Sequence, residues 1–494
     1  MFPTFVSHSD YQDVFASRFL DLFPDPFGIP KESWNIINQF FHLDLSETHS
    51  VLFDTYSAKG PSPRPPSCLL RSYLLMIKTG EVSISKWCDT LRLNPLYSIL
   101  SGFAVDDSPG IGTFYDFFSR CWGSESDNTF PHERPPKKKV AKGKKAGEKT
   151  PIDTSTVSER LFAFFDKHPI KEPKNPFALI LKLYTTQFLH VSHEKGFIDL
   201  DHLSLAGDGT PVVTSARMRR KTLCDCSSKG IRNCKCKRYY SQPDCDIGWD
   251  SSRLKYFNGY HLYIFVASNS FNDLPVFPML EPASRHDLPS FIHTLFTMQA
   301  WLPQLNIEKL ILDSAHDAMP VYEYCLNNQI TPLIDLNTRK LGHFTYKDSF
   351  TIDEDGVPIC REGLRMHRNG VERSKYRSKF RCPQATRKRG CFCDNPCSDA
   401  KFGRAIHTNL KDNPRLFCIP PRGSKEWKNE FARRSTSERS NKRQKIDYKI
   451  EDGKHRSSKM WYCRLYAIMM LQHLDAWEMP SVEAFQNIFV KQNA

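Results

Sequence analysis

Residues 202–213, with the sequence HLSLAGDGTPVV, are the stretch that decides the fold. Apolar Leu203 and Leu205 alternate with small or polar residues, which is typical of a strand, and Asp208 follows them closely. The pattern continues with strands expected at 260–267 (YHLYIFVA), 275–280, 309–312 (KLIL) and 331–336, and with helices expected at 289–301 and 319–327. Three strands followed by alternating helices and strands predict an α/β fold with a mixed sheet.

Changes in composition divide the rest of the chain. Residues 126–152 are rich in Lys, Pro and Gly and have almost nothing to bury, which predicts a flexible linker. Residues 339–425 interrupt the α/β pattern with Gly, Pro, Cys and charged residues, which indicates an insertion. We therefore expect a helical N-terminal domain (1–125), the basic linker (126–152), a helical connector (153–200), the first part of the α/β core (201–338), the Cys-rich insertion (339–425), a second part of the core with a helix (426–480) and a tail (481–494).

The overall composition excludes several classes of protein. The chain has 494 residues, of which 40% are hydrophobic and 25% are charged, as in globular proteins. It has no apolar stretch of the ~18 residues that a spanning helix needs, and its N-terminus lacks the basic and apolar regions of a signal peptide. We therefore expect a cytoplasmic protein without a membrane partner. Its 16 cysteines are then expected to be thiols or metal ligands before disulfides.

Positive charge is concentrated in three segments, residues 134–149, 217–238 and 427–459. They carry net charges of +7, +8 and +6, whereas the whole chain carries only +14. Each segment alone is equally consistent with a solvated surface. Three such segments around one candidate site favour nucleic acid as the partner.

Two aspartates follow apolar runs in positions where function is common. Asp208 lies in Ala-Gly-Asp-Gly-Thr within the first strand, directly after apolar Leu203 and Leu205, and Asp313 ends the run Lys309-Leu-Ile-Leu. An acid at the end of a buried strand is costly unless it is paired or binds a metal, and functional groups gather at the carboxyl ends of strands. The alternative for each is an Asp that forms a turn or caps a helix. Asp317 is the rival of Asp313, but it fits better at the start of the following helix.

A third acid, Glu438, lies in a basic segment near residue 435. On a regular helix, Phe431, Arg434, Glu438 and Lys445 fall within an arc of about 60°. One face would then carry an acid between two cations. The alternative is an ordinary surface helix with ion pairs between successive turns.

These residues resemble a known family. Phe431, Arg434, Glu438 and Lys445 resemble the Tyr-Arg-Glu-Lys signature of DDE transposases from bacterial insertion sequences, with Phe431 in place of the usual Tyr. The sequences around Asp208 and Asp313 resemble the two Asp motifs of the same family, Gly259-Tyr260-His261 resembles the pair that opens its second strand, and residues 65–100 more loosely resemble its helical N-terminal region. The resemblance extends from about residue 60 to residue 477.

The resemblance implies a ribonuclease-H-like catalytic core with the triad Asp208, Asp313 and Glu438. These carboxylates would bind Mg²⁺ or Mn²⁺, and two such ions can support phosphodiester cleavage and strand transfer. The DNA backbone would be bound by the side chains of Arg434, Lys445, Arg439 and Lys442. The implied partner is double-stranded DNA, as terminal inverted repeats and as target, bound by a homodimer in the nucleoid.

Two alternatives remain open at this stage. One is a non-catalytic, zinc-dependent DNA-binding protein on a transposase scaffold, and the other is a nuclease of the same fold that joins no strands. Three acids at one site argue against the first, because a binding module has no need of them beside DNA.

Two groups of cysteines lie in polar, basic surroundings, where buried structural cysteine is unusual. Short spacing between thiols suggests tetrahedral Zn²⁺. The expected ligands are Cys224, Cys226, Cys234 and Cys236 in the first group, and Cys382, Cys391, Cys393 and Cys397 in the second. The alternatives are one site with ligands from both groups, or ordinary surface thiols.

Overall fold

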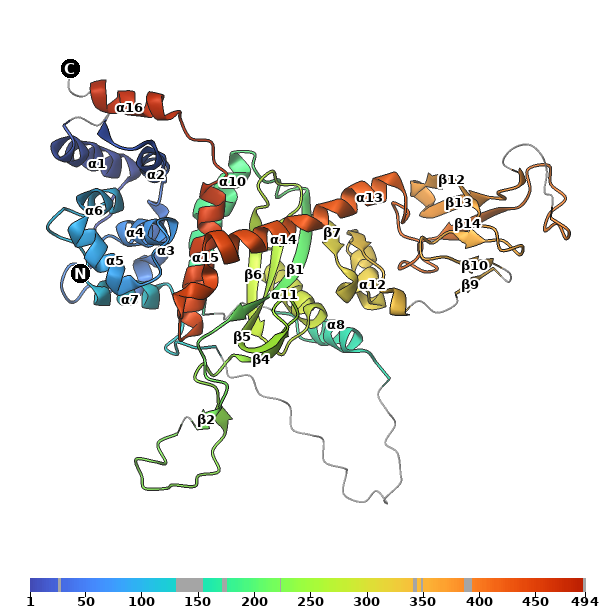
Figure 1. Ribbon diagram of the computed structural model, residues 1–494, viewed down its shortest axis with the longest axis horizontal. Helices are drawn as coiled ribbons and strands as arrows, with labels where there is room; N and C mark the ends of the chain where they lie inside the picture. Colours follow the sequence, from blue (N-terminus) through green and yellow to red (C-terminus); the bar gives the residue numbers. More distant parts are fainter. Residues whose placement is uncertain are drawn as a thin grey trace.

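A computed structural model of the protein shows an α/β fold around one mixed sheet (Figure 1). The structure describes residues 1–24, 28–129, 154–170, 176–222, 224–340, 344–347, 350–385 and 393–491. The predicted basic linker thus lies outside the described residues except for positions 126–129. No helix in the described part of the chain is both long enough and apolar enough to cross a membrane.

Six strands form the central sheet, and the five strands predicted from the sequence are among them. The strands are β1 (Leu203–Val213), β4 (Asp246–Asp250), β5 (Lys255–Ala267), β6 (Pro275–Pro282), β7 (Ile307–Leu312) and β8 (Thr331–Ile334). Their order is β4-β5-β1-β7-β8, and β6 also pairs with β5. β5 is antiparallel to β1, β4 and β6, whereas β7 is parallel to β1 and β8. The predicted α/β class with a mixed sheet is therefore confirmed.

Helices cover both faces of this sheet (Figure 1). One face packs against α11 (Asp287–Trp301). A helical run crosses the other face from β8 over β7 and β1 to β5. It comprises α13 (Lys425–Phe431), a 3-10 turn (Ala432–Arg434), α14 (Ser435–Lys442) and a π turn (Arg443–Asp447). Further along the chain follows α15 (Ser458–Leu474), in which every residue is buried.

The N-terminal part of the chain is helical, as predicted. Its helices are α1 (His8–Leu22), α2 (Lys31–Phe41), α3 (Glu47–Leu52), α4 (Pro66–Lys78), α5 (Ile84–Leu93), α6 (Pro95–Ser101) and α7 (Ile111–Arg120). The C-terminal segment, expected as a tail, contains α16 (Val482–Lys491), which returns to this bundle (Figure 1). Phe485 and Phe489 of α16 pack against Phe41 and Phe19 with ring centroids 5.1 and 4.9 Å apart. The two ends of the chain therefore share one core.

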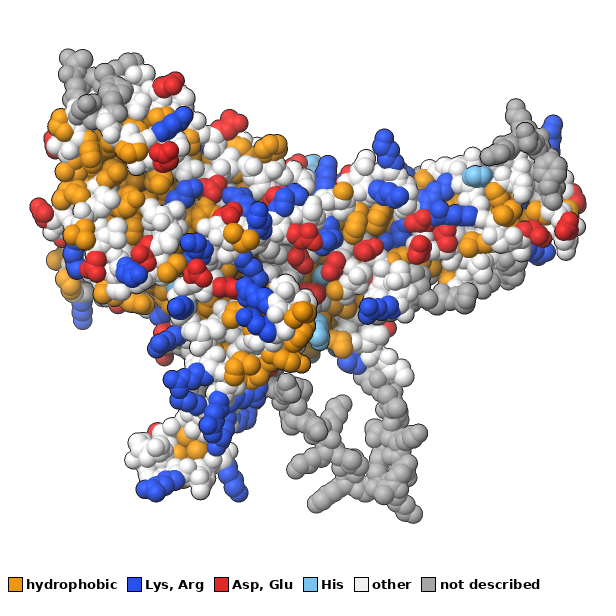
Figure 2. Space-filling view, in the orientation of Figure 1, with side chains coloured by type: hydrophobic (Ala, Val, Ile, Leu, Met, Phe, Trp, Pro, Cys, Tyr) orange, Lys and Arg blue, Asp and Glu red, His pale blue; other side chains and the backbone are white. Residues whose placement is uncertain are grey.

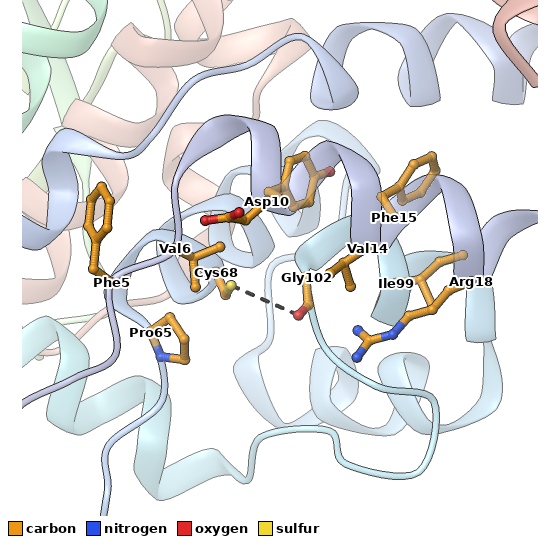
Figure 3. Close-up of a pocket in the computed structure, with 11 residues that line it drawn as sticks. Phe5, Val6, Asp10, Val14, Phe15, Arg18, Pro65, Cys68, Ile99 and Gly102 are labelled. Carbon is orange, nitrogen blue, oxygen red and sulfur yellow. Dashed lines mark hydrogen bonds between the residues drawn. The ribbon is translucent and has the colours of Figure 1, made fainter.

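A pocket of about 200 Å³ lies between α1, α4 and α6 (Figure 3). Gly102 at its wall follows α6 with φ at +96°, a left-handed conformation that favours glycine. A Cβ atom at this position would lie 2.7 Å from Cys68 Sγ. The close packing of α4 against the end of α6 therefore requires glycine here.

Shorter elements connect these parts. Along the chain, α7 is followed by α8 (Val157–Lys167), α9 (Ala178–Tyr184), a π turn (Thr185–Leu189) and α10 (His190–Glu194), before β1 begins. The helix α12 (Met319–Asn327) links β7 to β8. Two-residue strands β2 (Lys221–Thr222) and β3 (Arg238–Tyr239) form the stem of an arm between β1 and β4. Figure 1 shows this arm extending away from the sheet.

The insertion has its own small core. Its strands are β9 (Thr345–Tyr346), β10 (Phe350–Ile352), β11 (Pro358–Ile359), β12 (His367–Glu372), β13 (Arg377–Arg381) and β14 (Ala405–Asn409), in two three-stranded sheets. Phe350, Val357 and Phe380 are among the buried residues that pack together there. Figure 1 shows the insertion to one side of the central sheet, beyond α12.

Candidate active site

Asp208 lies on β1 between two glycines that face the opposite side of the sheet. A side chain at Gly207 or Gly209 would collide with Tyr263 or with His261 and Asp287, on the face that α11 covers. Because side chains alternate along a strand, Asp208 points to the face that α14 covers. There its Oδ2 accepts a hydrogen bond of 3.1 Å from Asn441 Nδ2.

Asp313 occupies the corresponding place on the neighbouring parallel strand. The register pairs Ala206 of β1 with Ile311 of β7, so that two residues later Asp208 and Asp313 lie side by side where β7 ends. Asp313 Oδ1 accepts hydrogen bonds from the backbone N–H of Ala315 at 3.1 Å and from His316 Nδ1 at 2.6 Å. The parallel register thus brings together two of the three predicted acids.

A hydrogen-bonded chain fixes the orientation of Asp313. With His316 Nδ1 donating to Asp313, the Nε2 atom accepts from the hydroxyl of Tyr263 at 2.9 Å. His316 and Tyr263 are both fully buried. The carboxylate is therefore held by a rigid support, as ligands in metal sites commonly are.

The electrostatics of this site set Asp208 apart. Burial, together with the nearby charges of Asp287 and Asp313, raises the pKa of its carboxyl to about 6. Burial also opposes ionisation of Asp287, but His261, His316 and His286 together outweigh it and lower the pKa of Asp287. A buried carboxyl whose pKa is raised by neighbouring acids marks a candidate functional site.

Glu438 is not drawn into this acidic pair. Its carboxylate is half exposed and accepts a 2.5 Å hydrogen bond from Arg434 one turn earlier in the helical run. Within the described residues, the oxygens of Asp208, Asp313 and Glu438 do not all lie within 4.8 Å of one another. The residue of α14 that reaches Asp208 is instead Asn441, one turn beyond Glu438.

The four predicted DNA-binding cations differ in their surroundings. Arg439 makes a two-pronged ion pair with Asp273, at 2.6 and 2.7 Å. Burial lowers the pKa of Lys445, whose ammonium lies 3.9 Å from Glu451. Lys442 is exposed. The segment is helical as expected, but its 3-10 and π turns change the rotation per residue, so the four signature residues do not follow one regular helical face.

Asp317, the rival of Asp313, is fully engaged within the protein. Its buried carboxylate accepts two hydrogen bonds from Arg415 of the insertion, at 2.7 and 2.6 Å, and one from the hydroxyl of Tyr322 at 3.0 Å. The backbone N–H of Asn337 donates a further one at 2.8 Å. With its oxygens occupied in this way, Asp317 ties the insertion to the sheet rather than binding a ligand.

Replacing Asp317 by Ala is expected to destabilise the protein by about 3–5 kcal/mol, because Arg415 would be left without its buried counter-charge. Thermal or urea unfolding measures the change. Asp355→Ala removes a more exposed ion pair with Arg365 in the same insertion and should cost less than about 1 kcal/mol. Equal effects of the two substitutions would contradict the structural role of Asp317.

The first cysteine group converges on one point. The Sγ atoms of Cys224, Cys226, Cys234 and Cys236 all lie within 4.8 Å of one another. Two cross-hairpin pairs, Cys224 with Cys234 and Cys226 with Cys236, are each 3.6 Å apart. Zinc–sulfur bonds of ~2.3 Å in a tetrahedron require sulfurs about 3.8 Å apart. These four cysteines could therefore hold a metal such as zinc.

The second group is described only in part, because Cys391 lies outside the described residues. Cys382, Cys393 and Cys397 line one small pocket together with Cys360. Cys360 was not among the predicted ligands of this group. The three described members remain predicted zinc ligands.

Comparisons with known proteins do not add to this description. No family model matches the chain, and no curated protein matches it in sequence. The residues and their geometry alone therefore carry the functional argument.

Sequence reasoning overlooked three polar residues of the site. Asn441 follows Glu438 by one helical turn, which makes the two residues neighbours on the surface of a helix. This spacing is the signal by which Asn441 could have been found. Asp287 stands in the first turn of α11, where an acid is ordinarily explained by the helix dipole. His261 pairs with Asp287 at 3.1 Å, and nothing in its sequence surroundings indicates this contact.

Proposed function

We propose that the protein is a DNA transposase of the DDE type, which cleaves the ends of an insertion element and joins them to target DNA. The observation that carries the proposal is the pair Asp208 and Asp313 at the end of β7, beneath a helical run that carries Glu438 from 125 residues downstream. Functional carboxylates from distant parts of a chain commonly meet at the carboxyl ends of strands.

The strand order supports a ribonuclease-H-like core, the fold that the family resemblance implies. The antiparallel strands β1, β5 and β6 precede the parallel strands β7 and β8, and the insertion follows β8 before the chain returns with α14. This is the order and the interruption predicted from the sequence.

The donor set fits a hard divalent cation. Asp208 Oδ1 and Asp313 Oδ2 have no hydrogen-bond partner among the described residues, whereas the other oxygen of each carboxylate is held in place. Mg²⁺ prefers such carboxylate oxygens and keeps several waters. When bound, Mg²⁺ or Mn²⁺ would activate the attacking hydroxyl and stabilise the leaving oxygen.

Glu438 would complete the set of ligands on this proposal. Its second oxygen, Oε2, has no partner among the described residues, and its link to Arg434 is a half-exposed ion pair of small expected strength. A DNA phosphate would compete for Arg434 and so release Glu438 towards Asp208 and Asp313. Lys445 and Lys442 would contribute further phosphate contacts along the same helical run.

Structural zinc is the second metal in the proposal. The first cysteine group would hold Zn²⁺ through four thiolates, and the second group is proposed to do the same with Cys382, Cys391, Cys393 and Cys397. Segments that are too polar to fold around an apolar core can be stabilised by such sites.

The test combines the purified chain with DNA that carries the inverted repeats flanking its gene, in Mg²⁺ or Mn²⁺. The expected products are element ends with free 3′-hydroxyls, followed by joined molecules in which these ends are linked to target DNA. Cleavage without joining would identify a nuclease of the same fold instead.

A non-catalytic DNA-binding protein on the same scaffold is the second candidate. The observation that favours it is the ion pair between Glu438 and Arg434, which leaves the third acid away from the pair. DNA binding with no cleavage under any divalent-metal condition would support this candidate.

A further inference from the structure

The arm between β1 and β4 comprises residues 214–245, and no described residue of its outer part, 217–238, is buried. The strands described there, β2 and β3, have two residues each, and Met218 and Ile231 are about half exposed, at 51% and 52%. A hairpin of this kind is at best marginally stable in water. Something other than hydrophobic burial must therefore hold its tip together.

The four cysteines of the first group stand where such a support is needed. Cys224 and Cys226 lie on one side of the loop, and Cys234 and Cys236 lie on the other, with Gly230 at φ +76° in the turn between them. All four sulfurs lie within 4.8 Å of one another. One shared centre explains this arrangement better than two separate disulfides, whose sulfurs would be ~2.05 Å apart within each pair.

The surface of the arm is strongly basic. Between residues 217 and 238 there are nine Lys and Arg residues and one acid, Asp225, which pairs with Lys229 at 2.5 Å. All nine cationic side chains are exposed. Figure 2 shows them gathered along the arm and at its stem. This density of charge on one projecting hairpin is the electrostatic footprint of a polyanion-binding surface.

The stem of the arm is anchored close to the candidate active site. Arg220 stacks on Tyr240 at 4.6 Å and pairs with Asp246 of β4 at 3.2 Å. The backbone N–H of Arg217 donates to Ser241, and its carbonyl accepts from Asn258 of β5. The arm begins just beyond Val213, the last residue of the strand that carries Asp208. The stem of the arm is therefore fixed to the sheet that carries Asp208.

We propose that this arm is a zinc-organised clamp for the phosphate backbone of double-stranded DNA. The thiolates of Cys224, Cys226, Cys234 and Cys236 hold one Zn²⁺ and give the hairpin tip a defined shape. The basic side chains on both sides of the loop then contact phosphates without reading the base sequence. The inference rests on the proposed function for its choice of DNA, and it adds the surface and the metal on which binding depends.

Metal loss and charge loss have different consequences in this arrangement. Removing two arm cations removes about two phosphate contacts but leaves the metal site intact. Removing two thiols keeps every cation but leaves the tip without a fixed shape. Part of the binding free energy is then lost in ordering the tip, and the affinity for DNA falls. The pair of measurements, zinc content and salt-dependent DNA affinity, therefore separates the two contributions.

The experiment compares three variants of the full chain with the wild type, by metal analysis and by binding to a duplex of arbitrary sequence at several salt concentrations. Cys226→Ser with Cys236→Ser should lose one zinc per chain and bind DNA about tenfold more weakly. Arg219→Ala with Arg232→Ala should keep the zinc but reduce the slope of log affinity against log salt by about 2. Lys401→Ala with Lys411→Ala, two exposed cations of the insertion, should change neither quantity.

Several outcomes would overturn the inference. A cysteine variant that keeps its zinc, or thiols found as two disulfides in protein purified under reducing conditions, removes the metal site. Unchanged salt slopes for the arm cations, or tighter binding to RNA or to an acidic polypeptide than to duplex DNA, remove the DNA clamp. If the arm variants bind normally while the wild type still cleaves DNA, only this inference fails; a wild type that binds no DNA contradicts the proposed function as well.

Discussion

Replacing Asp208 by Asn is expected to reduce DNA cleavage by about a thousandfold or more, while DNA binding is retained. The substitution removes one of the two acids whose charges interact beside the end of β7, and an amide is a poor ligand for Mg²⁺. Binding should persist because the substitution leaves every cation that supplies the affinity unchanged. Cleavage rates and affinity for the same duplex, measured in parallel, separate the two effects.

The same substitution should make the protein more stable near neutral pH. The pKa of Asp208 is about 6 in the folded protein, above its ordinary value of 3.8, so the folded state binds the proton more tightly than the unfolded state. The protein therefore loses stability as the pH rises from about 4 to 6, and at pH 7.5 ionised Asp208 costs about 3 kcal/mol. Asn carries no charge and avoids this cost.

Thermal unfolding without added divalent ions measures the effect. The Asn variant should unfold at a higher temperature than the wild type at pH 7.5, and the difference should disappear below about pH 3, where Asp208 is protonated in both states. Added Mn²⁺ should stabilise the wild type more than the variant. Asp335→Asn, an exposed acid directly after β8, should leave cleavage unchanged. A variant of Asp208 that cleaves DNA at the wild-type rate would exclude its catalytic role.

The central strands could be recognised from the sequence because they are buried on both faces. β7 and β8 end in buried apolar residues, and the first five residues of β1 are all buried. The strand β4 gives no such signal, since its inward residues Asp246 and Asp250 are acids. The cost of burying them is offset because Arg220 pairs with Asp246 and because the backbone N–H groups of Ser252 and Arg253 donate to Asp250. A pattern of hydrophobicity cannot reveal a strand whose buried side chains are polar.

The two aspartates of the candidate site could be predicted for the same reason, since Asp208 follows the apolar start of β1 and Asp313 follows the apolar end of β7. The contact of Asn441 with Asp208 could not. It depends on how the helical run crosses the sheet, and the 3-10 turn before α14 and the π turn after it alter the direction of every side chain on the run. Spacing on an ideal helix identifies which residues share a face, but the packing against β1 and β5 decides which of them reaches the partner.

The cysteine arm shows a further limit of what the sequence alone can predict. Its four candidate ligands were predicted from the short spacing of thiols in basic, polar surroundings, where buried structural cysteine is unusual. The pairing across the hairpin, Cys224 with Cys234 and Cys226 with Cys236, follows from the loop geometry and is not specified by the spacing. The helix α16 packs its aromatic side chains against the N-terminal bundle, a contact that the local sequence does not reveal.

Glu438→Gln is expected to reduce cleavage at least about a hundredfold and to leave folding unaffected. Glu438 is half exposed and is linked only to Arg434 in the described structure, so its loss should change stability by less than about 0.5 kcal/mol. DNA binding should be unchanged or slightly tighter, because one negative charge is removed and Arg434 becomes available to phosphate. Cleavage is lost only if Glu438 joins Asp208 and Asp313 when DNA is bound.

Glu430 provides a matched control on the same helical run. It also makes one ion pair, with Lys309 at 3.0 Å, but it lies over β8 and β7 rather than over β1. Glu430→Gln removes a comparable pair and should leave cleavage within about twofold of the wild type. If both variants cleave normally, Glu438 is an ordinary surface acid paired with Arg434, and the chain would be better explained as a DNA-binding protein on a transposase scaffold. If only Glu438→Gln is inactive while both variants bind DNA, the third carboxylate acts in the chemistry, and the ion pair with Arg434 describes the state before DNA is bound.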